Sequence, residues 1–594
     1  MTRRLVAILV ALSLGPALDS IPAASAATAA AASANSDLDK LATDFWTWRD
    51  RTSPFTGDDV PRVERTAETT SDGGRDWSPA GIAARHRTLA EFEARWRAMA
   101  TNASKWPVSD QVDYQLIGSA IARVRWELDL NRLWQRDPGF YVEQTLSALT
   151  ESLDQPSPFD AEHSHTIQTR MEEIPALLES AKINLHAARP FTELTIQSLR
   201  GVRPQLLQVQ AEVAPMLAGS DAAAFPAATE KAIAALEDYR AWLEKNLNSM
   251  PVPTAIGRSN YEFFLSHVAL QPYTPEEMLR ISRQEWERTM AFEQYEKQRD
   301  QGQPELTIAA NIDQEIRSNE TDELAVRKFL EDRGILSVPP GMGHYALRPM
   351  PGYLAALGGF DETDFFLGPT GVRYIHNPSP DLGFFELSAT KDPRPLMVHE
   401  GIPGHFFQLA LARAHEDSTR RHYYDSGPSE GIGFYSEEMM LQAGLFDDRP
   451  RVREIIYSFM RLRALRVEVD VKLALGQFTI AQAADYLQQY VPMDPQTARG
   501  EAASFAATPG QAITYQIGKS QIVRFLADAK LKQGSAFELR AFHDYLWKNG
   551  NVPIALQRWE YLGLEDDWRT VEKHRAGSGG AAGGPKPTAA KSAD

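Results

Sequence analysis

Apolar residues recur along most of this chain at the three- and four-residue spacing of amphipathic helices. The period is clear in residues 37–250, where one stripe consists of Leu38, Leu41, Phe45 and Trp48. This spacing places apolar side chains on one face of a helix, so it predicts a series of helices packed against each other. Helix boundaries are expected at the prolines of this region, which are Pro156, Pro158, Pro190, Pro204, Pro215 and Pro226.

Helical spacing continues in the second half of the chain after a short interruption. Pro251-Val252-Pro253 predicts a break between two lobes of the fold near residues 251–260. Thr274 is expected to cap a helix that begins at Pro275, with Glu277 as the reciprocal capping residue. The sequence therefore predicts a mainly α-helical protein.

One region departs from the helical pattern. Residues 336–394 are rich in proline, glycine and aromatic residues, with β-branched residues near Val372. This composition predicts a short sheet or hairpin just before the motif described below, and a packed connecting loop is the alternative. An edge strand at this position could pair with the backbone of an extended peptide.

Both ends of the chain differ from the rest. Residues 1–26 have the basic, apolar and small-residue parts of a secretory signal, ending at Ala24-Ser25-Ala26, and the apolar part is short for a membrane anchor. An Ala/Ser-rich spacer at 27–36 and a Gly/Pro-rich tail at 576–594, which is expected to be disordered, leave 37–575 as the folded unit. We therefore expect an exported protein, periplasmic or secreted, with no membrane segment after signal cleavage.

Composition excludes several classes of function. The 594 residues are 43% hydrophobic, which is enough for a large core. The net charge of −17 argues against nucleic-acid binding, which needs clustered lysine and arginine. The absence of cysteine excludes disulfides, thiolate metal ligands, a cysteine nucleophile and an acylated lipoprotein cysteine. The oligomeric state is not indicated.

The motif that concentrates chemistry is His399-Glu400-Gly401-Ile402-Pro403-Gly404-His405. Two histidines and a carboxylate in an apolar setting predict a divalent-metal site, with zinc preferred, in a hydrolase. In such a site Glu400 would be the general base. His405 follows His399 at i+6, which points about 120° away on a regular helix. The hypothesis therefore requires a broken or bulged helix at Pro403-Gly404.

A resemblance to a known family adds to this interpretation. The motif, Ser429-Glu430-Gly431-Ile432-Gly433-Phe434-Tyr435-Ser436-Glu437-Glu438, the segment Pro509 to Lys519, and Phe542-His543-Asp544 with Gly550 to Pro553 together resemble the bacterial domain of unknown function 885 family. Its members are similar to helical zinc peptidases of the angiotensin-converting enzyme and neurolysin type. The resemblance implies a large two-lobed helical fold, a peptide substrate and one Zn²⁺ ion, with another divalent metal as the alternative.

The resemblance also implies roles for individual residues. It indicates His399, His405 and a downstream glutamate as metal ligands, and Glu430 is preferred over Glu437 as the third ligand. Glu437, two turns further along, would then accept a hydrogen bond from a ligand histidine. Tyr515 is the candidate donor to the developing oxyanion, and His543 is the second candidate.

One departure from the family pattern affects these assignments. Many members carry a histidine where this chain has Phe406, so the prediction relies on His405. Two other functions remain open: a metal-dependent amidase acting on peptidoglycan stems or amino-acid conjugates, and a non-catalytic peptide-binding protein whose site has decayed.

A run of charged residues follows the second motif on a strongly helical segment. Its members are Arg461, Arg463, Arg466, Glu468 and Asp470. The run indicates a mostly solvent-facing surface, because exposed ion pairs of this kind contribute little to stability. Arg466 and Asp470, four residues apart, are one candidate for an inward-facing pair.

Overall fold

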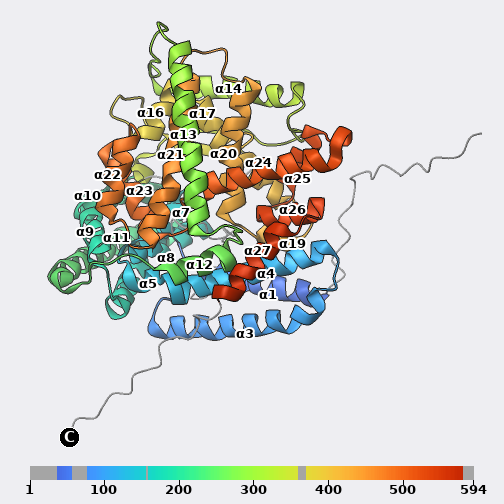
Figure 1. Ribbon diagram of the computed structural model, residues 1–594. Helices are drawn as coiled ribbons and strands as arrows, with labels where there is room; N and C mark the ends of the chain where they lie inside the picture. Colours follow the sequence, from blue (N-terminus) through green and yellow to red (C-terminus); the bar gives the residue numbers. More distant parts are fainter. Residues whose placement is uncertain (1–35, 56–75, 155–157, 359–369, 579–594) are drawn as a thin grey trace, which may run out of the picture.

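The computed structural model describes residues 36–55, 76–154, 158–358 and 370–578. The predicted signal, nearly all of the spacer and residues 579–594 of the tail lie outside these ranges. The fold is mainly α-helical, as the hydrophobic period predicts (Figure 1). No helix in the described ranges is long and apolar enough to cross a membrane.

Helices make up most of the described residues before the predicted break. The α-helices are α1 (Ser36–Thr52), α3 (Pro79–Ala103), α4 (Val108–Arg125), α5 (Leu133–Arg136), α6 (Gly139–Val142), α7 (Ala148–Leu153), α8 (Ala161–Asn184), α9 (Arg189–Ser198), α10 (Val202–Val213) and α11 (Gly219–Asn246). Shorter helical segments of other types are η1 (Trp126–Asn131), η2 (Glu143–Ser147), η3 (Leu199–Gly201), η4 (Ala214–Met216) and η5 (Leu247–Ser249).

The described residues after the break are also mainly helical and include two strands. Its elements are α12 (Arg258–Phe263), η6 (Phe264–Val268), α13 (Pro275–Arg299), α14 (Ile312–Asp332), β1 (Tyr345–Pro349), α15 (Gly352–Ala356), β2 (Gly371–Ile375), α16 (Phe384–Lys391), α17 (Arg394–Glu400), α18 (His405–Arg413), α19 (Ser418–His422), α20 (Ser426–Ala443), α21 (Val452–Ala474), α22 (Ile480–Tyr490), α23 (Pro495–Ala507), α24 (Thr514–Gln533), η7 (Gly534–Ala536), α25 (Leu539–Lys548), α26 (Ile554–Leu562) and α27 (Asp566–Ser578).

Several local signals in the sequence are found where expected, and others are not. Thr274 and Glu277 form the predicted capping box at the start of α13. Pro226 was expected to end a helix but lies inside α11, where Phe225, Thr229 and Ile233 are buried on one face. Packing of that face outweighs the backbone hydrogen bond that proline removes. Residues 576–578 belong to α27 rather than to the tail.

The small β element before the motif is present, and it is not a hairpin. Strands β1 and β2 pair in parallel, from Tyr345 opposite Gly371 to Pro349 opposite Ile375. Parallel strands need a crossover between them, which a tight turn cannot supply.

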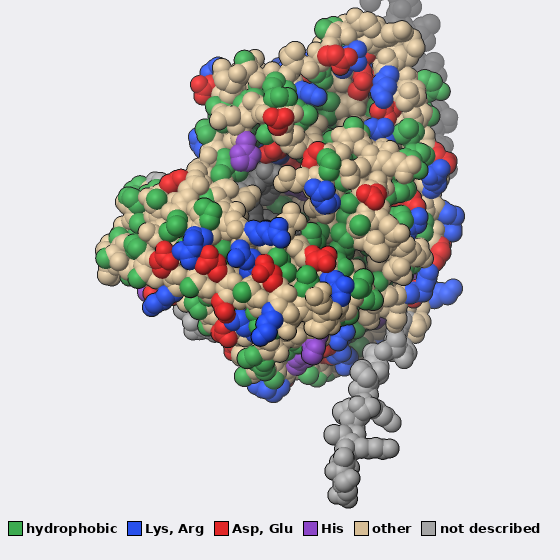
Figure 2. Space-filling model, turned by 90° about the vertical axis from the view of Figure 1, so that its left-hand side faces the viewer, with side chains coloured by type: hydrophobic (Ala, Val, Ile, Leu, Met, Phe, Trp, Pro, Cys, Tyr) green, Lys and Arg blue, Asp and Glu red, His purple; other side chains and the backbone are tan. Residues whose placement is uncertain are grey.

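Helix α21 is the central element of the second half. Its side chains enter three of the four hydrophobic clusters, represented by Met460, Phe459 and Val467. The buried positions therefore surround the helix, and the charged residues among them cannot all face solvent. The surface itself is hollowed near the centre of the face turned to the viewer in Figure 2, where charged side chains of both signs border the hollow.

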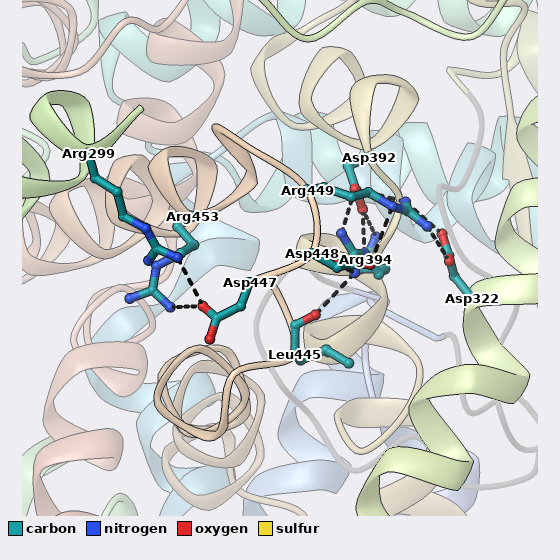
Figure 3. A network of polar contacts seen from close by, with 9 residues as sticks. All are labelled: Arg299, Asp322, Asp392, Arg394, Leu445, Asp447, Asp448, Arg449 and Arg453. Carbon is teal, nitrogen blue, oxygen red and sulfur yellow. Dashed lines mark hydrogen bonds and ion pairs between the residues drawn. The ribbon is translucent and has the colours of Figure 1, made fainter. Parts of the chain in front are cut away.

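A buried ion-pair network anchors the start of α17 (Figure 3). Asp392 is 1% exposed and accepts two hydrogen bonds of 3.0 Å from the guanidinium of Arg394. Arg449 donates to Asp392 at 2.9 Å and also binds Asp322 of α14. Arg394 donates to the carbonyl of Leu445 at 3.1 Å, in the connection that follows α20. The network therefore links α17 to the segment between α20 and α21.

Replacing Asp392 tests this anchor. The substitution Asp392→Ala leaves the buried Arg394 without its bidentate partner, so we expect a loss of about 3 kcal/mol or more in unfolding free energy. Arg299 also lies in Figure 3, but its side chain is 50% exposed and its partners are 3.5 and 3.7 Å away. Arg299→Ala should cost at most about 1 kcal/mol. Urea titration measures both, and equal losses would contradict the assignment.

Candidate metal centre

The helix break that the metal hypothesis requires is present between α17 and α18. Helix α17 ends at Glu400 and α18 begins at His405, and the Ile402–Pro403 peptide between them is cis. The Trp547 indole N–H donates to the Pro403 carbonyl at 2.6 Å. A Cβ atom on Gly404 would lie 1.6 Å from the His399 carbonyl oxygen, so the chain folds back onto the end of α17 at a residue that must be glycine.

This reversal brings the two histidines together. Their ring centroids are 4.8 Å apart, with the planes at 86°. Glu430 of α20 reaches the same point, because its Oε2 lies 3.2 Å from Nε2 of His399 and 3.2 Å from Nε2 of His405. Two ligands of one tetrahedral zinc ion, each about 2.0–2.1 Å from the metal, lie about 3.3 Å apart. Each histidine–Glu430 pair therefore has the spacing of two ligands on one tetrahedral ion.

Glu400 stands beside this set at a longer distance. Its carboxylate oxygens are 3.9 Å from Nε2 of His399 and 3.8 Å from Nε2 of His405. One ligand atom each from His399, Glu400 and His405 lies within 4.8 Å of the others, so Glu400 is also near enough to be considered as a ligand. The shorter and equal distances of Glu430 make it the better candidate ligand, and Glu400 lies farther from both histidines. We refer to His399, Glu400, His405 and Glu430 together as the metal cluster.

The other ring nitrogens have partners that orient both histidines. Nδ1 of His399 lies 2.8 Å from Oε1 of Glu437, and Nδ1 of His405 lies 3.3 Å from the Ser429 hydroxyl. Each Nε2 forms a hydrogen bond with the Glu430 carboxylate. A histidine that binds a metal through Nε2 would instead hold its ring proton on Nδ1. Glu430 therefore contacts the Nε2 edge of the His399 ring, and Glu437 contacts the Nδ1 edge. Of the two glutamates, only Glu430 also contacts Nε2 of His405.

Electrostatics within the metal cluster favour ionised carboxylates. Burial opposes ionisation of Glu430, but His405 and His399 beside it hold its pKa well below the usual value. Burial acts against ionised Glu400 in the same way, and His399 and His405 lower its pKa. Burial and the charge of Arg463 oppose protonation of His399, yet the surrounding glutamates outweigh both and raise its pKa. The carboxylates thus carry the negative charge that a divalent cation would neutralise.

Two glycines of α20 allow neighbouring helices to pack closely, and each contacts a different helix. A Cβ on Gly433 would lie 2.9 Å from the His399 ring, so this glycine lets α20 pack against α17. A Cβ on Gly431 would lie 2.9 Å from the Gly518 backbone, so Gly431 serves the crossing of α20 with α24 instead. Of these two glycines, only Gly433 lies at the contact with α17.

Phe406 points away from the metal cluster. It is 2% exposed, it packs against Gly371 of β2, and its ring centroid is 6.2 Å from that of Tyr345 on β1. The side chain at this position belongs to the hydrophobic core, whereas His405 faces Glu430. The departure at Phe406 therefore leaves the geometry of the three proposed ligands intact.

Tyr515 lies against the metal cluster. Its ring stacks on the His399 ring with centroids 6.1 Å apart and planes at 16°. The guanidinium of Arg466 lies 4.5 Å from the Tyr515 ring centroid and is itself paired with Glu501 of α23. The structure therefore brings the Tyr515 ring beside His399.

The charged run on α21 has a different role from the one expected. Arg463 and Arg466 are 2% and 5% exposed and Asp470 is fully buried, so the solvent-facing interpretation is wrong for these three. The expected Arg466–Asp470 pair is also wrong, because Arg466 binds Glu501. Asp470 accepts hydrogen bonds from the backbone N–H groups of Gly510 and Ala512 and from the Tyr261 hydroxyl at 2.7 Å. These bonds fix the segment that leads into Tyr515.

His543 is not brought into the metal cluster. It is fully buried, its Nδ1–H donates to the Ile335 carbonyl at 2.8 Å, and its Nε2 accepts from the Tyr435 hydroxyl at 2.9 Å. Both ring nitrogens are thus engaged with residues outside the cluster. Burial lowers the pKa of His543 to about 4. This geometry fits a neutral histidine that joins α25 to α20, rather than a donor to a substrate.

The sequence of this chain matches the profile of a known protein family. The profile described as "Bacterial protein of unknown function (DUF885)" matches residues 65–326 and 372–559. The chain belongs to the DUF885 family. The matched ranges of this DUF885 chain include the whole metal cluster, together with Tyr515 and the buried residues of α21. No curated protein matches it.

Two solved structures share the fold of this DUF885 protein. One is a candidate lipoprotein of unknown function from Shewanella oneidensis, with a TM-score of 0.64 and 18% identity, covering 90% of this chain and 100% of that one. The other is a candidate lipoprotein from Colwellia psychrerythraea, with a TM-score of 0.68 and 15% identity, covering 91% and 99%. At these identities the likeness concerns the fold alone.

Substitution of Gly404 tests the chain reversal. Because the added Cβ has no room beside the His399 carbonyl, Gly404→Ala should lower the unfolding free energy by about 2 kcal/mol or more. Gly500 is the matched control: it lies in α23, and a Cβ there would meet nothing within 4 Å. Gly500→Ala should be stabilising by up to about 1 kcal/mol. Denaturation of both variants measures the difference, and a neutral Gly404→Ala would contradict the geometry.

The buried His543 predicts a pH dependence of stability. Its pKa falls from the ordinary 6.5 to about 4 in the folded state, so the unfolded chain takes up the proton first. The stabilising contribution is complete above about pH 6.5 and is lost as the pH falls towards 4, with a total on the order of 3 kcal/mol. His543→Asn should therefore lose less unfolding free energy than the parent protein between pH 7 and pH 5. The same substitution at the exposed His165 should change nothing, and identical pH profiles for all three proteins would refute the prediction.

Proposed function

We propose that this protein is a zinc-dependent hydrolase of peptide bonds that acts on short peptides. The observation that carries the proposal is the position of the Glu430 carboxylate oxygen, 3.2 Å from Nε2 of both His399 and His405, with Glu400 beside them. Two imidazoles and one carboxylate form a ligand set known from catalytic zinc sites. The ionised state of both glutamates fits a divalent cation.

Each residue of the site has a chemical task in this proposal. His399, His405 and Glu430 would hold the ion, which supplies Lewis-acid activation of water and of a carbonyl oxygen. Glu400 accepts the proton of the attacking water and returns it to the leaving amine nitrogen. The Tyr515 hydroxyl donates to the oxygen that becomes negative in the transition state, a contribution on the order of 3 kcal/mol to the barrier.

The finer parts of the proposal rest on family resemblance. The similarity to helical zinc peptidases of the angiotensin-converting enzyme and neurolysin type favours a two-lobed architecture and short peptides as substrates, by analogy. Export to the periplasm or the medium is supported by the signal-like residues 1–26 and by two structural neighbours described as candidate lipoproteins.

Metal content and activity measured together test the proposal. We expect about one zinc ion per chain, hydrolysis of short peptides, and loss of that activity on chelation. Glu400→Gln should retain the metal and lose at least about a hundredfold in kcat, because it removes only the base. Glu416→Gln changes an exposed carboxylate near the same motif and should keep full activity.

The outcomes separate the competing functions. Absence of bound metal, or undiminished activity in Glu400→Gln, would overturn the proposed mechanism. Hydrolysis of peptidoglycan stem peptides or amino-acid conjugates in place of ordinary peptides would indicate an amidase. Peptide binding without turnover in the metal-loaded protein would indicate a binding protein.

A further inference from the structure

A buried arginine stands behind the metal cluster. Arg463 of α21 is 2% exposed, and its terminal nitrogen lies 2.8 Å from Oε1 of Glu437, which is fully buried. The same Oε1 atom lies 2.8 Å from Nδ1 of His399. One carboxylate oxygen thus faces both the arginine and the histidine that the proposed function makes a metal ligand.

Arg463 contacts both partners with one terminal nitrogen, which also lies 3.3 Å from Nδ1 of His399. Within the described residues, its Nε and its other terminal nitrogen have no hydrogen-bond partner. Its guanidinium carbon lies 5.3, 5.3 and 5.5 Å from the ring centroids of Phe434, Phe459 and Tyr515. Aromatic faces attract a cation without competing for its ion pair. The guanidinium is therefore held in place by rings, and its described ion pair is with Glu437.

The physical consequence concerns Glu437. A fully buried carboxylate is stable only with a nearby opposite charge, and removing that charge leaves it uncompensated. Glu437 must also keep its oxygen aimed at Nδ1 of His399, because that contact sets which ring nitrogen is free for the metal. Arg463 meets both needs, since it neutralises the carboxylate and contacts both Glu437 and Nδ1 of His399.

We propose that Arg463 is a positioning residue of the metal centre, which holds Glu437 and the Nδ1 edge of His399 together. The inference rests on the proposed function, since it concerns the affinity of the same site for a divalent ion. The competing explanation is that Arg463 only fills space between α20 and α21. The two explanations differ in whether Arg463 affects metal affinity and whether that effect is coupled to Glu437.

The experiment is a double-mutant cycle read out as zinc affinity in the full chain, measured by competition with a chromophoric chelator. Glu437→Gln should weaken zinc binding by about 10- to 100-fold, as partners of ligand histidines do. Arg463→Met should weaken it by about tenfold or more, and the double variant should lose less than the two single losses combined. Arg463→Lys, which keeps the charge, should recover part of the affinity.

Arg461 supplies the matched control. It lies on the same helix with a side chain that is 12% exposed, and it pairs with Glu293 rather than with a residue of the metal cluster. Arg461→Met should leave zinc affinity within about twofold of the parent protein. If Arg463→Met does not fold, the comparison of Arg463→Lys and Arg463→Gln at equal folded fraction replaces it, with the lysine variant expected to bind zinc more tightly.

The outcomes distinguish this inference from the proposed function. Failure of the parent protein to bind zinc would overturn both. Zinc binding by the parent protein together with unchanged affinity in Arg463→Met, or losses that add in the double variant, would overturn only the role of Arg463.

Discussion

The structure of the site depends on one constraint, the reversal of the chain between α17 and α18. On a regular helix, His399 and His405 would point in directions too different to contact one ion. The chain reversal at Pro403 and Gly404 brings their rings together. Glu430 then meets both imidazoles from α20 at equal distance. Each imidazole faces the Glu430 carboxylate at Nε2 and an orienting partner at Nδ1. These contacts fix the orientation of both rings without an ion.

The surrounding helices keep this geometry in place by burying charge. The pair of Asp392 and Arg394 holds the beginning of α17. Near the end of the same helix, Glu437 contacts the His399 ring. From α21, Arg463 reaches Glu437, while Asp470 binds the segment before Tyr515. Buried ion pairs contribute little net stability but penalise misplacement strongly, since a displaced partner leaves a charge alone in the core. We regard these pairs as the reason that a site built from several separate helices has a defined shape.

Local sequence signals predicted a good part of this arrangement. Proline and glycine rules located the break at Pro403 and Gly404, and capping chemistry located the start of α13 at Thr274. These features depend on neighbouring residues only. The choice between Glu430 and Glu437 could not be made from spacing, because both lie near one face of α20 and only the position of α17 distinguishes them.

Other residues were misjudged because their partners are distant in the sequence. Arg463 and Asp470 lie in a charged run that resembles a solvent-exposed helix face, yet both side chains are buried. Arg463 pairs with Glu437 of α20, and Asp470 accepts hydrogen bonds from the backbone of residues 510–512. A pattern of charges along one helix does not show that other helices bury most of its surface. His543 follows the same rule, since its neighbours Tyr435 and Ile335 come from separate elements and hold it outside the metal cluster.

The central claim is that two imidazoles and one carboxylate surround a single divalent ion. X-ray absorption spectroscopy of the zinc-loaded protein tests it most directly. The account predicts a first shell of nitrogen and oxygen atoms at about 2.0–2.1 Å, with the outer-shell scattering of two histidine rings, and loss of one ring's contribution in His405→Ala. A shell without histidine scattering, or one unchanged in that variant, would contradict it.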